Sequence, residues 1–267
     1  MQVKDVMTRD LIVIDKDVSL SHAIDLMVKN RVSRLLVINK GKLVGILTER
    51  DILDRLGSSR IGALQASSIH VSSAMTMNPV TVTPDTDVID AAKIMLEKKI
   101  SGLPVLEGGD LVGIITKSTM TKLCIKVRNV AVSQIMTENP LTVSPYERIT
   151  NVRRIMLEKG ISSLPVTEEG KLVGLITEGM IAKYLADFRS SVPEKYQTTR
   201  IRQIDVLDVM RKITPLHPDD PVGDAAEKLI REKTKAAPVM DRREKLVGIV
   251  TKTDFTRLVA NRFFPLK

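Results

Sequence analysis

The chain has one cysteine and no tryptophan among its 267 residues. The single Cys124 excludes an internal disulfide, and it cannot supply a cysteine-based zinc site. Its apolar neighbours in the stretch LCIKV favour a buried structural thiol over a nucleophile. The three histidines share no metal-ligand spacing, and His22 is predicted on the surface of a helix. We therefore expect no metal site and no catalytic cofactor.

Long hydrophobic runs are also missing. The longest apolar stretches, such as residues 35–38 and 43–47, are far too short to span a bilayer. The N-terminal segment MQVKDVMTRD mixes acids with bases and lacks the apolar region of a secretory signal. The hydrophobic and charged fractions, 43% and 27%, are ordinary for a globular chain. These features predict a cytoplasmic protein with no membrane association.

Aromatic residues are few, and none precedes Tyr146. The first 145 residues therefore offer no ring on which a nucleic-acid base could stack. Lys and Arg number 41 against 32 Asp and Glu, which gives a net charge of +9. This excess favours anionic partners, but it does not choose among nucleotides, nucleic acid and acidic proteins.

A nine-residue block occurs four times. It reads LVGILTERD from residue 43, LVGIITKST from 111, LVGLITEGM from 172 and LVGIVTKTD from 246. A methionine precedes the glycine of each block by 38 residues in every copy, in the pairs Met7 and Gly45, Met75 and Gly113, Met136 and Gly174, and Met210 and Gly248. The copies start 68, 61 and 74 residues apart, so the repeat is a compact block with variable linkers, not a solenoid.

Each copy has the same predicted order of elements. An extended stretch is followed by a helix with apolar residues at helical spacing, a short buried strand, a glycine turn, the LVG strand and a second helix. The chain is therefore predicted to be α/β (α+β), with four β-α-β-β-α units. One unit of about 60 residues has a thin core, so we expect the units to pack as two pseudo-twofold pairs. Copy one should pair with copy two, and copy three with copy four, each across a shared helical interface.

The block resembles the CBS motif (cystathionine β-synthase domain). The resemblance rests on the four VG-h-h-T strands, the Met-Thr leads at residues 7, 75 and 136, and LPV at residues 103 and 164. Four copies look like two Bateman modules, similar to the family of AMP-activated protein kinase gamma subunits. The expected boundaries are 1–60, 68–127, 130–188 and 203–264 for the motifs, 1–128 and 129–267 for the modules, and 57–72 and 188–205 for the linkers inside them.

The resemblance implies a regulatory sensor of adenosine-containing ligands: AMP, ADP, ATP or S-adenosylmethionine. Such a module would report nucleotide levels, and thus energy state, to an unidentified protein that it controls. The two pairs either close into a disc within one chain, or each seeks a partner chain, as in a homodimer. The sequence leaves both arrangements open.

A Thr-x-x-Asp pattern lies where the LVG strand passes into the second helix. The free N–H groups and the dipole at a helix start favour an anion, and the acid can accept hydrogen bonds from ribose hydroxyls. The pattern is complete at Thr48 and Asp51 in copy one and at Thr251 and Asp254 in copy four. Copies two and three carry Thr119 and Met180 in the Asp column. We therefore predict ligands at copies one and four, although the same pattern is also a helix-capping box.

Cations and backbone groups complete the predicted sites. Arg34 stands where family members often carry a phosphate-binding arginine, and Lys235 lies one position earlier in copy four. A solvated surface position is the alternative for both side chains. Adenine contacts in the family come largely from backbone at the first strand, which the resemblance carries over to Ile12 and Thr214.

The sequence offers no catalytic motif, neither a G-x-S-x-G elbow nor a G-x-x-x-x-G-K loop, so we expect no enzyme. Two other functions compete with the sensor. A nucleic-acid-binding protein would use the basic stretch of Lys122, Lys126 and Arg128, and this is the less favoured alternative. A scaffold with decayed sites is disfavoured by the intact Asp51 and Asp254.

Overall fold

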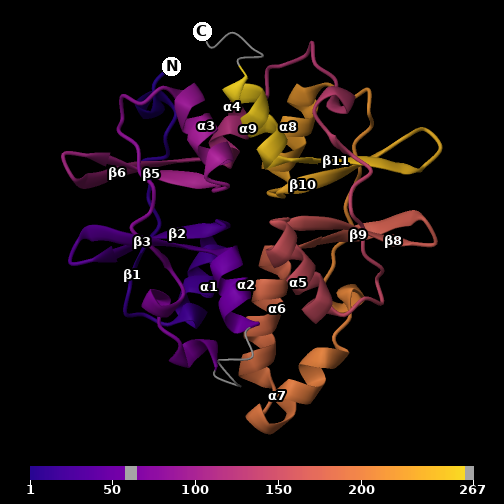
Figure 1. Cartoon of the computed structure of the whole chain (residues 1–267), viewed down its shortest axis with the longest axis horizontal. Coiled ribbons are helices and arrows are strands. Elements are labelled where there is room, and N and C mark those ends of the chain that lie inside the picture. The colour runs from indigo at the N-terminus through magenta and orange to yellow at the C-terminus, as the bar shows by residue number, and fades with distance from the viewer. Residues whose placement is uncertain (58–64, 262–267) are drawn as a thin grey trace. The chain divides into compact units, whose positions relative to one another are not determined.

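The structure is a computed structural model of the chain and describes residues 1–57 and 65–261. It contains two compact units, each assembled from separate stretches of the chain (Figure 1). As far as they are described, unit 1 comprises Met1–Leu11, Pro79–Pro140 and Thr214–Lys267, and unit 2 comprises Ile12–Asn78 and Leu141–Ile213. Each unit thus draws on all four copies of the repeat.

The α/β (α+β) expectation is confirmed, since every copy has two helices around an antiparallel hairpin (Figure 1). Copy one contains β1 (Val13–Asp15), α1 (Leu20–Asn30), β2 (Arg34–Asn39), β3 (Lys42–Thr48) and α2 (Glu49–Leu56). Copy two contains α3 (Val88–Glu97), β5 (Gly102–Glu107), β6 (Asp110–Thr116) and α4 (Lys117–Leu123). Copy three contains α5 (Ile149–Lys159), β8 (Ser163–Glu168), β9 (Lys171–Thr177) and α6 (Glu178–Ser191). Copy four contains α8 (Val222–Arg231), β10 (Ala236–Met240), β11 (Leu246–Thr251) and α9 (Lys252–Ala260).

The first strand of the repeat is fully formed only in copy one, where β1 runs parallel to β2. In the other copies it shrinks to one bridge each, Val82 with Val105, Val143 with Val166 and Leu216 with Val239. The cause lies in the facing strand. Leu36 donates its N–H to the Ile12 carbonyl at 3.3 Å, whereas the matching positions hold Pro104, Pro165 and Pro238. Proline has no N–H, so this hydrogen bond is lost in three copies.

The segment that leads into each copy packs on the neighbouring copy, not on its own. These leads contain the short 3₁₀ helices η1 (Val3–Asp5), η4 (Val71–Ser73), η5 (Val132–Gln134) and η7 (Val206–Asp208), and the strands β4 (Thr76–Met77) and β7 (Thr137–Glu138). The lead of copy two adds β4 to β3 of copy one, and Thr8 in the lead of copy one bridges Ile114 of copy two. Copies three and four exchange leads in the same way, through β7 on β11 and the bridge of Leu175 with Arg211.

This exchange explains the constant interval between methionine and glycine. The Met75 sulfur lies 2.7 Å from where a Cβ on Gly45 would stand, and Met7 lies against Gly113 in the same manner. Met136 and Met210 cover Gly248 and Gly174 of the second pair. Each methionine therefore needs a bare glycine in its neighbour, and the equal intervals keep all four contacts in register.

Helix packing within the units joins different copies from those expected. In unit 2, α2 of copy one packs along α6 of copy three, and in unit 1 α9 of copy four packs on α3 and α4 of copy two. The core of unit 2 accordingly mixes copies one and three, and that of unit 1 mixes copies two and four. The prediction that a helical interface joins copy one to copy two was wrong in this respect. Copies one and two are joined by their exchanged leads. The second helices of these copies, α2 and α4, pack instead against α6 and α9.

The expected linkers contain helical structure where they are described. Residues 188–205 hold the last turn of α6, the helix α7 (Glu194–Arg200) and η6 (Ile201–Gln203). The linker 57–72 contains η3 (Ala66–Ser68), while its residues 58–64 lie outside the described part, as do residues 262–264 of copy four. Among the described helices, none combines the length and apolar character that a membrane crossing needs.

Candidate ligand-binding site

The junction between strand and second helix is built alike in all four copies. The threonine that ends the strand is the N-cap of the helix, and its hydroxyl oxygen accepts a backbone N–H from the first turn. In copy two Thr119 fills the place of the acid and bonds the Thr116 backbone at 3.3 Å. In copy three Thr177 caps alone, receiving the N–H of Met180 at 3.3 Å. The capping role weighed in the sequence is therefore real in every copy, and only two copies add a carboxylate to it.

In copy one the carboxylate keeps one oxygen available. Asp51 Oδ2 accepts the Thr48 N–H at 2.8 Å and the Thr48 hydroxyl at 2.7 Å. Within the described residues no hydrogen bond is formed to Oδ1. Burial raises the pKa of Asp51, and the hydrogen bonds from Thr48 oppose that shift. The half-buried Oδ1 can thus accept a hydroxyl from a ligand without breaking the cap.

In copy four both carboxylate oxygens are engaged. Asp254 Oδ2 accepts the Thr251 N–H at 2.7 Å and its hydroxyl at 2.9 Å, while Oδ1 accepts from Arg257 Nη1 at 2.8 Å. Asp254 is buried, whereas the Arg257 side chain is 55% exposed. A ligand hydroxyl can reach Oδ1 of Asp254 only if this exposed arginine swings away. Sequence reasoning missed Arg257, although its place three residues after Asp254 on a helix could have revealed the pair.

Arg34 lies directly across the hairpin from Thr48. Its Nη2 donates to the Ser33 hydroxyl at 3.0 Å, and burial lowers the pKa of its guanidinium to about 10, against the opposing charge of Glu49. The structure thus brings together Arg34, Thr48 and Asp51, as the sequence predicted for one site. Arg34 is half-buried in β2.

Lys235 occupies a different position from Arg34. Ala236, not Lys235, faces Thr251 across the hairpin, and the Lys235 carbonyl accepts the N–H of Lys252 at 3.1 Å. Lys252 is the first residue of α9, and its Nζ donates to Ser118 Oγ at 3.0 Å. Lys117, the first residue of α4, donates to Thr253 Oγ1 at 3.0 Å in return. The helix starts of copies two and four thus bring two further lysines beside the predicted site, which the sequence analysis did not single out.

In unit 2 the equivalent helices begin with acids and not with lysines. Glu49 and Glu178 are the first residues of α2 and α6, and Arg50 lies 3.5 Å from Glu178. Arg50 also donates to the carbonyls of Met156 and Leu157 at 2.8 and 3.1 Å. The charge at this position is therefore reversed between the two units. Such a contrast gives the two predicted sites different electrostatic surroundings.

The two predicted adenine contacts also differ. Ile12 and Thr214 are equivalent positions, since each precedes by two residues the residue that pairs with the second strand, Ile14 and Leu216. The Ile12 carbonyl is already bonded to Leu36. The Thr214 carbonyl faces the strand that contains Pro238, which can donate no N–H. The Thr214 carbonyl is thus more available to a ligand than the Ile12 carbonyl.

The remaining residues considered in the sequence have no functional environment in the described structure. Cys124 is fully buried, and burial raises the pKa of its thiol to about 12, which confirms the structural interpretation. His22 lies exposed on α1, as predicted. Within residues 1–57 and 65–261, no three His, Cys, Asp or Glu side chains are grouped as a metal site would need. The methionines Met27, Met95 and Met156 are buried in the cores.

Comparison with known proteins gives a consistent match. The CBS domain model matches residues 3–58, 71–126, 132–187 and 204–261. Protein MJ1225 of Methanocaldococcus jannaschii is 26% identical, with 97% of this chain and 98% of that protein covered. Its crystal structure, described as a candidate archaeal homologue of g-AMPK, superposes with a TM-score of 0.84 at 25% identity over 96% of this chain and 99% of that chain.

Shorter matches cover parts of the chain. Inosine-5'-monophosphate dehydrogenase of Korarchaeum cryptofilum is 40% identical over 96 residues, which is 36% of this chain and 20% of that enzyme. The CBS domain pair of protein MJ0100, solved in complex with 5-methylthioadenosine and S-adenosyl-L-methionine, covers 46% of this chain and 94% of that one. It is 29% identical and has a TM-score of 0.42. The chain thus spans about a fifth of this enzyme relative and nearly all of MJ1225.

Proposed function

Since the chain belongs to the CBS domain family, with four copies, we propose that it is a regulatory sensor of adenosine-containing ligands. The ligands are AMP, ADP, ATP or S-adenosylmethionine, bound at copies one and four, and the bound state is read by a protein that this chain controls. The observation that carries the proposal is the open Oδ1 of Asp51 at the start of α2, beside the half-buried Arg34 that faces Thr48 across the hairpin.

The chemistry at copy one suits a nucleoside monophosphate. Asp51 accepts a ribose hydroxyl, as acids do in dinucleotide folds, and the start of α2 with Arg34 receives an anionic tail. Glu49 offsets part of the charge of Arg34. The net attraction for a polyphosphate is therefore limited at copy one.

Copy four suits a longer anionic tail. The N-terminal turn of α9 adds the charge of Lys252 beside Thr251, Lys117 at the start of α4 reaches Thr253, and the Lys235 carbonyl contacts the Lys252 N–H. Positive charge of this density favours di- and triphosphates over monophosphates. We infer that copy four prefers ATP or ADP, and that the ratio of nucleotides is the energy signal.

The protein acts by binding and not by catalysis in this proposal. Its carboxylates cap helices, and its one thiol is buried with a raised pKa, which is the opposite of an activated nucleophile. The reciprocal leads support grouping copies one and two, and three and four, as the two modules 1–128 and 129–267. A homodimer is not needed to complete any copy in this grouping.

The test is a titration of the full chain with AMP, ADP, ATP, S-adenosylmethionine and adenosine by calorimetry and thermal shift. Asp51→Ala and Asp254→Ala should each remove one site, with affinity there falling about 30- to 150-fold, since a carboxylate bond to a ligand hydroxyl contributes about 2–3 kcal/mol. Saturating ligand at about 100 times its dissociation constant should stabilise the wild type by about 2.7 kcal/mol. Asp25→Ala, on the exposed face of α1, is the matched control. Normal binding by the double variant would contradict the assignment.

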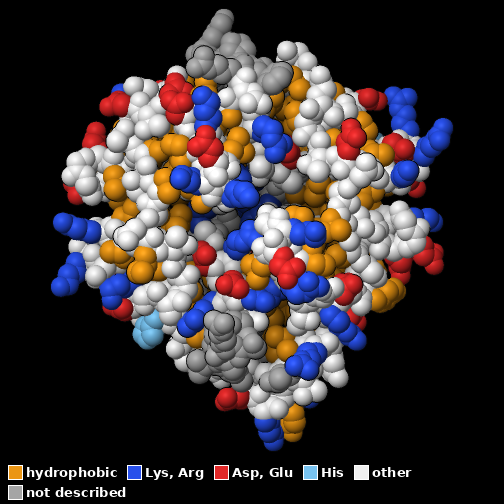
Figure 2. Space-filling view, viewed as in Figure 1, with side chains coloured by type: hydrophobic (Ala, Val, Ile, Leu, Met, Phe, Trp, Pro, Cys, Tyr) orange, Lys and Arg blue, Asp and Glu red, His pale blue; other side chains and the backbone are white. Residues whose placement is uncertain are grey.

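The nucleic-acid alternative makes a different prediction. Arg128 in the basic stretch is paired with Asp224, and Figure 2 shows Lys and Arg interspersed with Asp and Glu on the face it displays. Neither observation favours an extended basic surface. If no adenosine compound binds, and RNA binds more tightly than a polyanion control with affinity falling as salt rises, the alternative replaces our proposal.

A further inference from the structure

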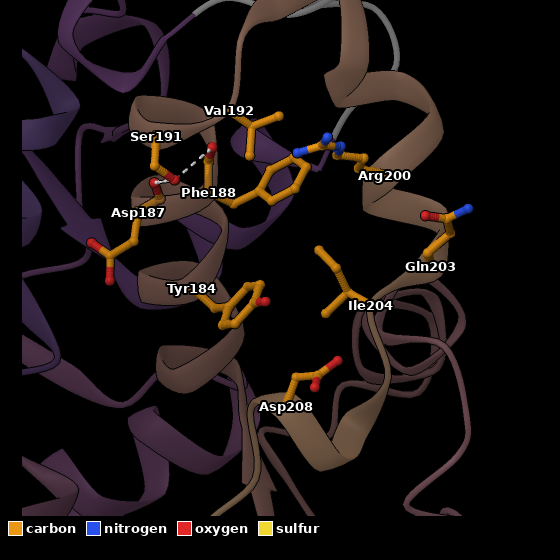
Figure 3. A pocket seen from close by; sticks show the side chains of 9 residues that line it. All are labelled: Tyr184, Asp187, Phe188, Ser191, Val192, Arg200, Gln203, Ile204 and Asp208. Carbon is orange, nitrogen blue, oxygen red and sulfur yellow. Dashed lines mark hydrogen bonds between the residues drawn. The ribbon is translucent and has the colours of Figure 1, made fainter.

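A cavity lies in unit 2 at the linker expected over residues 188–205. It has a volume of about 520 Å³, within the range of small-molecule sites. It is formed by the C-terminal turns of α6, by α7 and by the segment that follows (Figure 3). The lining residues are Tyr184, Asp187, Phe188, Ser191, Val192, Arg200, Gln203, Ile204 and Asp208.

The walls of this cavity are an addition to the repeat. Helix α6 has 14 residues, whereas its counterparts α2, α4 and α9 have 8, 7 and 9. The extra turns of α6 and the helix α7 have no equivalent in the described parts of the other copies, whereas η6 corresponds to η3 (Ala66–Ser68), which precedes η4 by the same interval as η6 precedes η7. The extra turns of α6 contribute Phe188 to the core of unit 2, and the same side chain lines the cavity.

The added wall is held firmly. Gln197 of α7 is 5% exposed, and its Nε2 donates to the carbonyls of Arg189 and Val192 at 3.0 and 2.8 Å. Arg189 in turn donates to the carbonyl of Leu56 in α2. These bonds fix α7 against the end of α6, so a ligand would meet a preformed site and lose little free energy in ordering it.

The middle of the cavity is apolar. Phe188 and Ile204 are 9% and 6% exposed, and Figure 3 shows them facing the same space as the ring of Tyr184. Two of the polar lining residues are already used. The Ser191 hydroxyl donates to the carbonyl of Asp187, and the Asp187 carboxylate pairs with Lys183 at 2.6 Å.

Opposite charges stand at the two ends of this apolar space. Figure 3 shows Arg200 at one end and Asp208 at the other, with Tyr184, Phe188 and Ile204 between them. Arg200 lies over the Tyr196 ring at 5.3 Å, and Asp208 Oδ2 accepts the Asp205 N–H at 3.0 Å. Neither charge forms an ion pair within the described residues. Burial and the negative charge of Asp208 raise the pKa of Tyr184, so Tyr184 stays a neutral donor at this end.

We propose that this cavity binds a small zwitterion whose amine and carboxylate are separated by an aromatic or aliphatic spacer. The carboxylate pairs with Arg200, the amine pairs with Asp208, and the spacer packs against Phe188, Ile204 and the Tyr184 ring. A nucleotide is the wrong ligand here, because Arg200 is the one cation among the lining residues and the Asp208 carboxylate at the other end would repel phosphate. The site is separate from the Thr-x-x-Asp columns and does not rest on the proposed function.

The experiment uses the full chain and three aromatic probes. 4-(Aminomethyl)benzoate carries both charges, benzylamine carries only the amine, and 4-methylbenzoate carries only the carboxylate. Binding is measured by saturation-transfer NMR and by titration. The zwitterion should bind at least about tenfold more tightly than either single-charge probe, since each charge-assisted hydrogen bond contributes more than about 1.4 kcal/mol.

Two variants identify the ends of the site. Arg200→Gln should weaken 4-methylbenzoate and leave benzylamine unchanged, whereas Asp208→Asn, which keeps an oxygen to cap η7, should do the reverse. Both should weaken the zwitterion about tenfold, and Glu194→Gln on the exposed face of α7 should have no effect. Adenosine ligands titrated into the same samples should bind as in the wild type. Absence of zwitterion binding, or equal sensitivity of both single-charge probes to both variants, would overturn the proposal.

Discussion

Asp51 and Asp254 occupy the same position in the repeat, yet the carboxylate oxygen that is not used in the cap has different neighbours in the two copies. Oδ1 of Asp51 has no partner within the described residues, and Oδ1 of Asp254 holds Arg257. The pairing with Arg257 makes copy four depend on the movement of one exposed side chain. Single residues outside the Thr-x-x-Asp pattern thus decide how available each carboxylate is.

Arg257→Ala should improve ligand binding at copy four. The variant frees Oδ1 of Asp254, so a ligand hydroxyl no longer competes with an ion pair worth about 1 kcal/mol at most. We expect about a fivefold gain in affinity, measured by calorimetry in an Asp51→Ala background so that only copy four binds. The same substitution tested in an Asp254→Ala background should have no effect on copy one. A loss of affinity would show that Arg257 contacts the ligand.

Asp51→Asn should gain stability relative to the wild type as pH rises. Because burial raises the pKa of Asp51 above its unfolded value, the native state binds more protons between the two values. The contribution of Asp51 to the free energy of unfolding therefore falls as pH rises through this window and is constant above it. The asparagine in the variant does not titrate, so it makes no such pH-dependent contribution. Urea unfolding at several pH values between about 4 and 7 measures the difference, with Asp25→Asn as the control. A pH-independent difference would contradict the raised pKa.

The residues of the predicted sites were only partly visible in the sequence. The repeat columns located Thr48, Asp51, Thr251 and Asp254, because a cap must stand where the strand ends. The structure places Arg34 across the hairpin from the capping threonine, and its role in binding phosphate stays a prediction. Lys117 and Lys252 escaped attention because they donate to Thr253 and Ser118 in different copies, and no spacing within one copy encodes such a contact.

Elements are linked between copies through the exchanged leads. The interval of 38 residues looked like a feature internal to each copy, although each methionine covers the glycine of its neighbour. The sequence could not separate these cases, because equal intervals place the contact in register either way. The shortening of the first strand was readable, since Pro104, Pro165 and Pro238 stand where copy one has Leu36.

Gly45→Ala should destabilise the protein by about 1–3 kcal/mol, and Met75→Ala should reverse part of that loss. The added methyl group would lie 2.7 Å from the Met75 sulfur and 3.0 Å from the Thr76 carbonyl. Urea unfolding of the single and double variants measures the coupling. Met77→Ala, on the exposed side of β4, should give no rescue.

Gly174→Ala gives the contrasting case. Its methyl group would meet the backbone oxygen of Arg211 at 2.8 Å, and trimming Met210 cannot move that atom. Rescue of Gly174→Ala by Met210→Ala would show that the exchange of leads is looser than described.

At the scale of the whole molecule, neither predicted module contains a complete core. Module 1–128 holds α2 without α6, and it holds α3 and α4 without α9. We expect the fragment 1–128 to form a homodimer, because the apolar faces of these helices need cover. Mixed with the fragment 129–267, it should form a one-to-one complex, measured by light scattering after gel filtration. A folded, monomeric fragment would contradict this expectation.

The cytoplasmic location stays a prediction.

The interleaving of the two units has a consequence for synthesis on the ribosome. Unit 2 ends at Ile213, so its core can close while Thr214–Lys267 is still being added. Helices α3 and α4 of unit 1 must wait for α9, which belongs to that last stretch. At about 5–20 residues per second, the ribosome needs roughly 3 to 10 s to add the stretch Thr214–Lys267. During this time the nascent chain carries one closed core and one open apolar face, which makes unit 1 the part of the molecule that chaperones would have to protect.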